Sequence, residues 1–143
     1  MMADSMKRDF EILEHTADAG IIAYGKDMPE AFANAARGLF SLIVDPDSIN
    51  ETLHRDVALE AADPPNLLVD WLNELIYLFD TEGTIFKRFD IIRLDPTHIE
   101  ARAHGEKATS SKHEIKTGVK AATYHMLSIT QDSGCQVRVL FDL

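Results

Sequence analysis

The chain has 143 residues, of which 45% are hydrophobic and 27% are charged, and this length and composition are typical of one soluble globular domain. Its 24 acidic and 14 basic residues give a net charge of −10. Because contacts to phosphate require a basic surface, the chain is a poor candidate for binding RNA by itself. No apolar run approaches the ~18 residues of a membrane helix, and the polar start, Met1 to Phe10, lacks the apolar stretch of a signal peptide, so we expect a cytoplasmic protein without a membrane span.

Alternation of apolar and polar residues, helical spacing and turn signals divide the chain into short elements. In chain order, the pattern predicts a strand at 10–13, a polar loop at 15–20, a strand at 21–24, a helix between Asp27 and Asp45, a strand at 57–61, a helix from Asp63 through Phe79, strands at 86–94 and 98–104, a loop at 105–112, and strands at 120–130 and 135–141.

Each predicted helix has a start signal. Asp27 is expected to cap the first helix, with Glu30 three residues later as in a capping box. Asp63 precedes two prolines, which the first turn of the second helix tolerates. The second helix also carries a narrow polar stripe made of Asp70, Asn73, Glu74 and Tyr77. This stripe is either an exposed helix face, the commoner case, or a contact surface for a partner.

Strands separated by helices and hairpins indicate an α+β fold. We expect a single domain at residues 10–143, with a mixed β-sheet covered by two main helices, after a flexible N-terminal segment at residues 1–9. The single cysteine, Cys135, excludes an internal disulfide and a paired-cysteine zinc site. Its neighbours predict a strand, so Cys135 is interpreted as a small, half-buried hydrophobic residue.

Three carboxylates are candidates for a cation site. Asp18 belongs to the predicted polar loop, whereas Asp142 and the free carboxylate of Leu143 follow directly from the last predicted strand. If that strand ends near Asp18, the three anions would repel one another strongly, and a divalent cation would relieve the repulsion. Oxygen ligands favour Ca²⁺ or Mg²⁺ over zinc, with Mn²⁺ left open. The pattern alone favours the ordinary alternatives, which are an Asx turn at Asp18 and a solvated chain end.

Other polar residues carry weaker signals. His15 is either a metal ligand or, as we favour, a satisfied half-buried histidine. Lys120, in the predicted strand at 120–130, is suited to hold an anion or a partner's carboxylate, although lysines are usually just solvated. The chain has no glycine-rich phosphate loop and no HExxH motif, and spacing suggests no nucleophile–base pair. We therefore do not expect an enzyme.

Six strings together resemble the archease family. They are HTADAGI at 15–21, EAFANAARGLFSL at 30–42, LLVDWLNELIYLFD at 67–80, GE at 105–106, VKAATYH at 119–125 and VRVLFDL at 137–143. Each string is weak alone, but six in order, at the family's spacing, are highly specific. The resemblance extends from about Phe10 to Leu143.

The resemblance implies a function that the pattern does not show. Archeases assist the RtcB-type RNA ligase of tRNA splicing and RNA repair, promoting its guanylylation and repeated turnover, while the ligase carries the covalent chemistry. The family's metal ligands match Asp18, Asp142 and Leu143, with Ca²⁺ the favoured ion, and its functionally important lysine matches Lys120. Residues expected around this site or in contact with the partner are His15, Asp70, Asn73, Glu74 and His125.

The chain departs from the family at two positions, Gly118 and Thr109, where archeases often have acidic residues. These departures put a wider ligand shell in doubt and leave the three main ligands in place. Two other functions stay open as alternatives. One is a chaperone-like modulator of a tRNA methyltransferase or another RNA-processing enzyme, and the other, less favoured, is a metal-dependent hydrolase.

Overall fold

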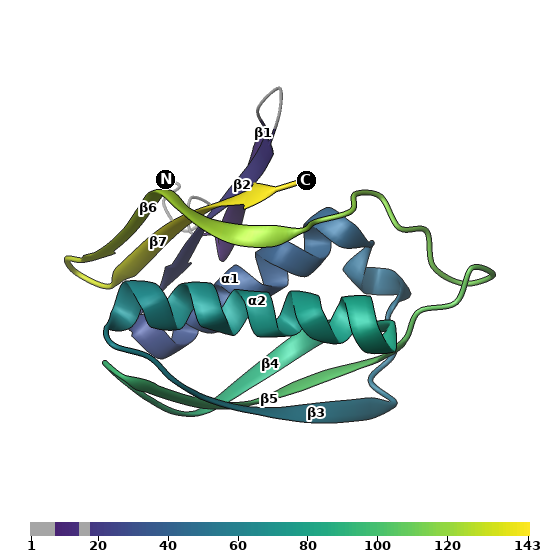
Figure 1. Ribbon diagram of the computed structural model, residues 1–143, viewed down its shortest axis with the longest axis horizontal. Helices are drawn as coiled ribbons and strands as arrows, with labels where there is room; N and C mark the ends of the chain where they lie inside the picture. Colours follow the sequence, from purple (N-terminus) through teal and green to yellow (C-terminus); the bar gives the residue numbers. More distant parts are fainter. Residues whose placement is uncertain (1–7, 15–17) are drawn as a thin grey trace, which may run out of the picture.

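The strands of this chain form two sheets, which lie on either side of a layer of two helices (Figure 1). The computed structural model describes residues 8–14 and 18–143. The elements in chain order are β1 (Phe10–Glu14), β2 (Asp18–Gly25), α1 (Met28–Ile43), the short 3-10 helix η2 (Pro46–Ser48), β3 (Leu53–Glu60), α2 (Pro64–Glu82), β4 (Thr84–Asp95), β5 (His98–Lys107), β6 (Ala121–Gln131) and β7 (Cys135–Asp142).

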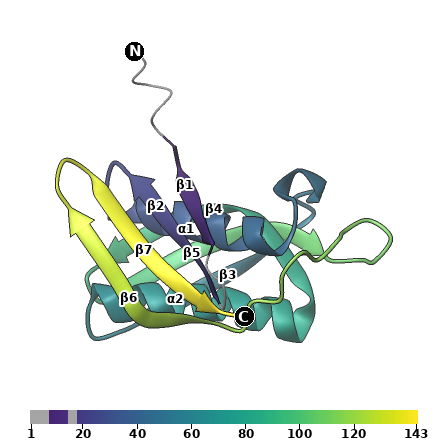
Figure 2. The same cartoon turned by 90° about the horizontal axis from the view of Figure 1, so that it is seen from above.

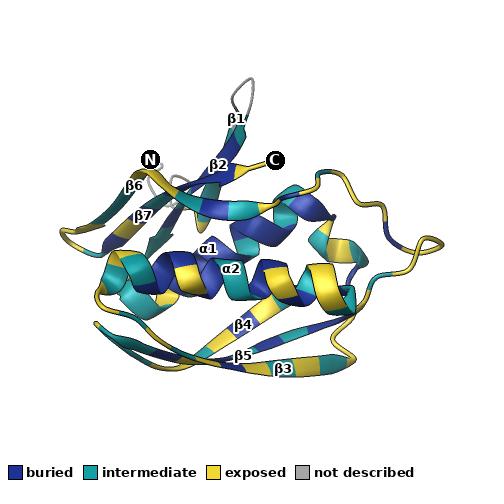
Figure 3. Ribbon diagram, viewed as in Figure 1, coloured by how far each residue is buried: buried dark blue, intermediate teal, exposed yellow. Residues whose placement is uncertain are grey.

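Both sheets are antiparallel. One has the strand order β1-β2-β7-β6 and the other has the order β3-β5-β4. The predicted α+β class with two main helices is therefore confirmed, but the strands form two antiparallel sheets where one mixed sheet was expected. Each sheet turns one face toward the helices, and buried residues alternate with more exposed ones along strands such as β3 and β5 (Figure 3). Antiparallel sheets suit this arrangement, because they commonly pack one face on the core and leave the other largely at the surface.

The core lies between the two sheets and consists mainly of aliphatic side chains, with a group of aromatic rings among them. Trp71 of α2 is fully buried, and its indole N–H donates to the main-chain oxygen of Phe32 at 3.0 Å, which ties α2 to α1. Phe40 of α1 meets the ring of Phe86 edge-on, with ring centroids 5.6 Å apart. These contacts join α1, α2 and the three-stranded sheet into one core. Among the described residues, no helix combines the length and apolar character of a membrane span.

The predicted helix starts are confirmed. The carboxylate of Asp27 accepts from the backbone N–H of Glu30 at 3.0 Å, and Asp63 accepts from the N–H of Asn66 at 3.0 Å. Such caps satisfy donors that have no partner inside the helix. The carboxylate of Glu30 accepts from the backbone N–H of Lys26 at 2.7 Å. In a capping box it would accept from the backbone N–H of the N-cap residue, Asp27, instead.

The connection from β5 to β6, residues 108–120, contains no helix or strand and is held by a buried carboxylate. Glu106 is 9% exposed and accepts from Lys112 Nζ at 2.7 Å and from the backbone N–H of Asn50 at 2.8 Å. The ring of His113 completes the cluster, with Nε2 at 2.9 Å from the same carboxylate. The predicted loop at 105–112 thus starts too early, because β5 continues to Lys107 and buries Glu106.

The tautomer of His113 follows from its contacts. Its Nδ1 accepts from the backbone N–H of Thr109 at 3.0 Å, so Nε2 carries the ring proton and donates a hydrogen bond to the Glu106 carboxylate. The ion pair with Lys112, the bond from Asn50 and the bond from His113 together hold the pKa of Glu106 down, to about 2. The carboxylate is therefore charged and fully bonded at neutral pH, and it fixes the start of the 108–120 connection.

A first prediction concerns the close approach of β4 and β5. A Cβ atom added at Gly105 would lie 1.8 Å from the main-chain oxygen of Ile85, and neither backbone can move without breaking the sheet. We expect Gly105→Ala to lower the free energy of unfolding by about 3 kcal/mol, measured by urea denaturation. At Gly118 an added Cβ meets nothing within 4 Å, so Gly118→Ala should change stability by less than about 1 kcal/mol. Equal effects of the two substitutions would contradict this packing.

A second prediction concerns pH. The folded-state pKa of Glu106, about 2, lies below its ordinary value of 4.5, so its contribution to stability is complete above pH 4.5 and is lost as the pH falls toward 2. Glu106→Gln should be less stable than wild type at pH 7 and should lose less stability between pH 4.5 and pH 2. Urea denaturation across this range measures both effects. Glu114→Gln, an exposed change on the same connection, should keep the wild-type slope, and parallel curves for Glu106→Gln and wild type would show that Glu106 is not held as described.

Candidate functional site

The pairing of β2 with β7 brings two predicted site residues together. In this antiparallel pair, Asp18 stands directly opposite Asp142. Residues opposite each other in an antiparallel pair point to the same face of the sheet, with Cβ atoms about 4.5–5.5 Å apart. Asp18 was expected in a loop, but β2 begins at this residue, so the strand itself positions its carboxylate.

The burial pattern decides which way these carboxylates point. On β7, Val139 and Phe141 are fully buried against the helices, and on β2 so is Ile21. Because side chains alternate along a strand, Asp142 and Asp18 fall on the opposite, outer face. Asp142 is exposed and Asp18 is partly buried. The two acids therefore form an accessible tip at one end of the four-stranded sheet.

A glycine allows close packing beside this tip. A Cβ at Gly20 would lie only 2.4 Å from Cδ2 of Leu140, so the absence of a side chain at Gly20 leaves room for Leu140 on the outer face. Leu140 is only 5% exposed. Two residues before Asp142, the outer face is thus apolar and closely packed, which holds the end of β7 in place.

The start of β6 is attached to the same tip. The backbone N–H of Lys120 donates to the main-chain oxygen of Asp142 at 2.8 Å, and Ala121 is the register partner of Asp142. The side chain of Lys120 is exposed. Figures 1 and 2 show the C-terminal end of β7 next to the start of β6. Leu143, the last residue of the sequence, follows Asp142 and is 40% exposed. Asp18, Lys120, Asp142 and Leu143 therefore lie at one end of the four-stranded sheet, and we call them the acidic tip.

The electrostatics of the acidic tip are unfavourable without a counter-ion. Like charges directly opposite each other in an antiparallel pair are destabilising. Within residues 8–14 and 18–143, no lysine, arginine or histidine forms an ion pair with Asp18 or Asp142. The same residues contain no group of three or more His, Cys, Asp or Glu side chains arranged so that it could hold a metal ion. Two facing carboxylates suit a hard cation such as Ca²⁺ or Mg²⁺ better than zinc, with main-chain oxygen or water as further ligands.

The other predicted residues occupy different positions. Asn73 of α2 accepts from the backbone N–H of Ala122 at 2.8 Å, so it joins the helix to the free edge of β6. Asp70 is exposed, and Glu74 is partly buried, so that burial and the negative charge of Glu82 raise the pKa of Glu74. His125 is exposed on β6. His15, like the N-terminal residues 1–7, lies outside the described residues.

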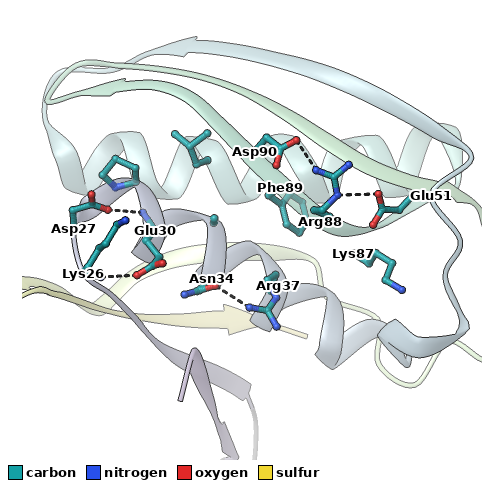
Figure 4. A pocket seen from close by; sticks show the side chains of 13 residues that line it. Lys26, Asp27, Glu30, Asn34, Arg37, Glu51, Lys87, Arg88, Phe89 and Asp90 are labelled. Carbon is teal, nitrogen blue, oxygen red and sulfur yellow. Dashed lines mark hydrogen bonds and ion pairs between the residues drawn. The ribbon is translucent and has the colours of Figure 1, made fainter. Parts of the chain in front are cut away.

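Two surface grooves lie away from the acidic tip. The first, about 680 Å³, runs between α1 and β4 (Figure 4). Arg88 in this groove bonds to Glu51 at 2.9 Å and to Asp90 at 2.7 Å. The second groove, about 870 Å³, is lined by residues such as Tyr24 and Gln136, at the opposite ends of β2 and β7 from Asp18 and Asp142. Neither groove is lined by residues of the acidic tip.

Sequence reasoning missed two features of the structure. Glu106 belongs to the GE string, but nothing in the pattern indicates that this carboxylate is buried and bonded to Lys112 and His113. The irregular pairing of β6 with β7 between Thr123 and Ser128 was also not predicted. The stretch contains no glycine or proline of the kind that often marks a bulge.

Comparison with known proteins agrees with this fold. The model of the Archease protein family matches residues 10–143. Proteins called archease from Saccharolobus islandicus and Methanosarcina mazei are 46% identical over 131 residues and 37% identical over 134 residues, and the alignments cover 91% of this chain with 94% and 92% of the relatives.

Two solved structures are also similar. The solution structure of Methanobacterium thermoautotrophicum protein 1598 is 37% identical, with a TM-score of 0.81, and the match covers 94% of this chain and 99% of that one. The crystal structure of a Thermotoga maritima protein, described as an archease and possible chaperone, has the same fold, with a TM-score of 0.64, 22% identity and coverage of 92% and 94%. On the family match, the relatives and the shared fold, this chain belongs to the archease family.

Proposed function

We propose that this archease is an accessory protein that activates an RtcB-type RNA ligase in tRNA splicing and RNA repair. In this proposal the ligase carries out the chemistry, and the archease promotes its guanylylation and repeated turnover without being an enzyme itself. Membership of the archease family supports this choice of partner. The observation that links the proposal to particular residues is the register of β2 with β7, in which Asp18 lies opposite Asp142 beside the start of β6.

We also propose that the acidic tip holds a divalent cation. Asp18, Asp142 and Leu143 would supply its ligands, and Ca²⁺ is the favoured ion, ahead of Mg²⁺ and Mn²⁺. The two facing carboxylates support this assignment, because they repel each other without a cation. A bound cation supplies positive charge where the chain's own residues are acidic.

The contribution of the chain itself lies in recognition and positioning. The bond to Asp142 fixes the backbone of Lys120 at the acidic tip, and the exposed side chain of Lys120 can meet an anion of the partner. The net charge of −10 suits a basic protein surface better than RNA. To accelerate the ligase, the archease must bind the ligase's nucleotide-competent state more tightly than its resting state. A hundredfold acceleration requires about 2.7 kcal/mol of such differential binding, which a few charged contacts can supply.

The cation is testable by thermal unfolding. Ca²⁺ at 100 times its dissociation constant should stabilise the wild-type protein by about 2.7 kcal/mol relative to the protein in EDTA. Asp142→Asn should lose this response, and in EDTA it should be about 0.2–1 kcal/mol more stable than wild type, because one of two repelling charges is gone.

The matched control for the cation test is Asp132→Asn, which removes an exposed carboxylate from the turn between β6 and β7, far from the acidic tip. It should respond to Ca²⁺ like wild type. A full Ca²⁺ response in Asp142→Asn would contradict the cation site.

The partner is testable by multiple-turnover RNA ligation with catalytic amounts of purified ligase. Wild-type archease should accelerate turnover, whereas Lys120→Ala or Asp142→Ala should weaken the stimulation about tenfold, equivalent to about 1.4 kcal/mol. Both side chains are exposed, so both variants should remain folded.

For comparison, Lys26→Ala removes an exposed lysine at the other end of β2 and should stimulate like wild type. If the Lys120 and Asp142 variants also stimulate fully, the site assignment is wrong. If wild type has no effect on the ligase, the proposed partner is wrong.

A further inference from the structure

The pairing of β6 with β7 contains an unusual irregularity. Thr123 pairs with Leu140 and Ser128 pairs with Arg138, so four β6 residues, 124–127, stand opposite the single β7 residue Val139. Within this stretch Met126 has a backbone φ of 55°. A side chain in this left-handed region is strained, and such strain persists only where surrounding contacts hold it.

Two contacts from other elements hold the irregular stretch. The hydroxyl of Tyr124 donates to the side-chain oxygen of Asn66 on α2 at 2.7 Å. The guanidinium Nε of Arg138 donates to the main-chain oxygen of Met126 at 3.1 Å. The stretch is thus tied to α2 at one side and to β7 at the other, and its conformation is fixed before any partner binds.

The side chains presented by this stretch are large and accessible. Tyr124 is 56% exposed and Met126 is 54% exposed, with exposed His125 between them. We call Tyr124, His125, Met126 and Arg138 the bulge patch. Tyrosine, methionine and arginine are enriched at the centres of protein interfaces, and a side chain that is already held loses little entropy on binding.

An alternative explanation is that the irregularity only protects the free edge of β6 from pairing with another strand. Proteins protect edges with charged residues, prolines or a twist of the strand, and none of these devices requires an exposed tyrosine and methionine. The bulge patch instead exposes two large side chains at a strained position. Protection of an edge therefore does not account for its composition.

The surroundings indicate the chemistry of the partner. Asp63 lies beside Asn66, whose side-chain nitrogen donates to its carboxylate at 2.9 Å, and exposed Asp70 follows one turn later on α2. Within residues 8–14 and 18–143, neither Asp63 nor Asp70 is in an ion pair. A complementary surface would offer an apolar pocket bordered by lysine or arginine.

We infer that the bulge patch is the anchor of a protein interface, and that its occupant is an apolar, basic-rimmed pocket on the ligase of the proposed function, on which this inference rests. Continuity with the acidic tip supports this choice, because Lys120 immediately precedes β6 and lies only four residues before Tyr124. One protein partner can therefore contact both features. The acidic tip is then the part that acts on the ligase, and the bulge patch is the part that holds the archease there.

The test uses a substitution that separates binding from folding. Met126→Gly removes the side chain and also relieves the strain, because glycine adopts positive φ readily. We expect its Tm to equal or exceed that of wild type, while its affinity for purified ligase, measured by calorimetry, falls at least tenfold. A residue with only a structural role would not lose binding while the protein keeps or gains stability.

Ser133→Gly is the matched control, since Ser133 is the other non-glycine residue with positive φ in the described part of the chain, at 59°, in the β6–β7 turn. It should likewise keep or raise Tm and should bind the ligase like wild type. Tyr124→Ser should weaken binding as Met126→Gly does.

The outcomes are distinguishable. If wild type binds and Met126→Gly and Tyr124→Ser bind equally well, the bulge patch is not the anchor and the proposed function stands. If wild type itself does not bind the ligase, the proposed function and this inference both fail. A patch used for self-association would appear as a wild-type dimer in sedimentation that Met126→Gly dissociates, and that result would also overturn the inference.

Discussion

The antiparallel pairing of β2 with β7 is the constraint on which the rest of this molecule depends. It joins the N-terminal and C-terminal parts of the chain in the middle of the four-stranded sheet, in a register that runs from Asp18 opposite Asp142 to Gly25 opposite Cys135. A shift of one residue would turn Val139 and Phe141 out of the core and Asp142 into it. Burial of the apolar residues therefore determines where the two carboxylates lie. The repulsion between the carboxylates costs less free energy than this burial contributes.

The same pairing organises the strand beside it. β6 begins next to Lys120, whose backbone N–H donates to the main-chain oxygen of Asp142. On the free edge of β6, the side chain of Asn73 on α2 accepts from the backbone N–H of Ala122. Further along, Tyr124 is bonded to Asn66 of the same helix. Helix α2 thus supports β6 at two points, Ala122 and Tyr124. Lys120 lies next to the acids immediately before these points, and Tyr124 remains accessible. A rigid support of this kind suits a protein that acts by binding and positioning.

Local features of the fold could be predicted from the sequence, whereas features that depend on distant contacts could not. Asp27 and Asp63 act as helix caps through neighbours three residues away, so their pattern was sufficient. The division of the strands into two sheets depends on which strands meet across the whole chain, and the expected single mixed sheet did not anticipate it. The pairing of Asp18 with Asp142 was proposed from the chain end and the family resemblance, not from spacing. The burial of Glu106 and the strained Met126 arise from contacts with Lys112, His113 and Arg138, which no local pattern encodes.

The most direct test of this account is a crystal structure of the protein grown with Mn²⁺, with anomalous diffraction recorded to locate the ion. The account predicts an anomalous peak bonded to the carboxylates of Asp18 and Asp142, with the β2–β7 register as described. Diffraction that shows the two carboxylates turned apart, or Mn²⁺ bound only elsewhere on the acidic surface, would contradict it.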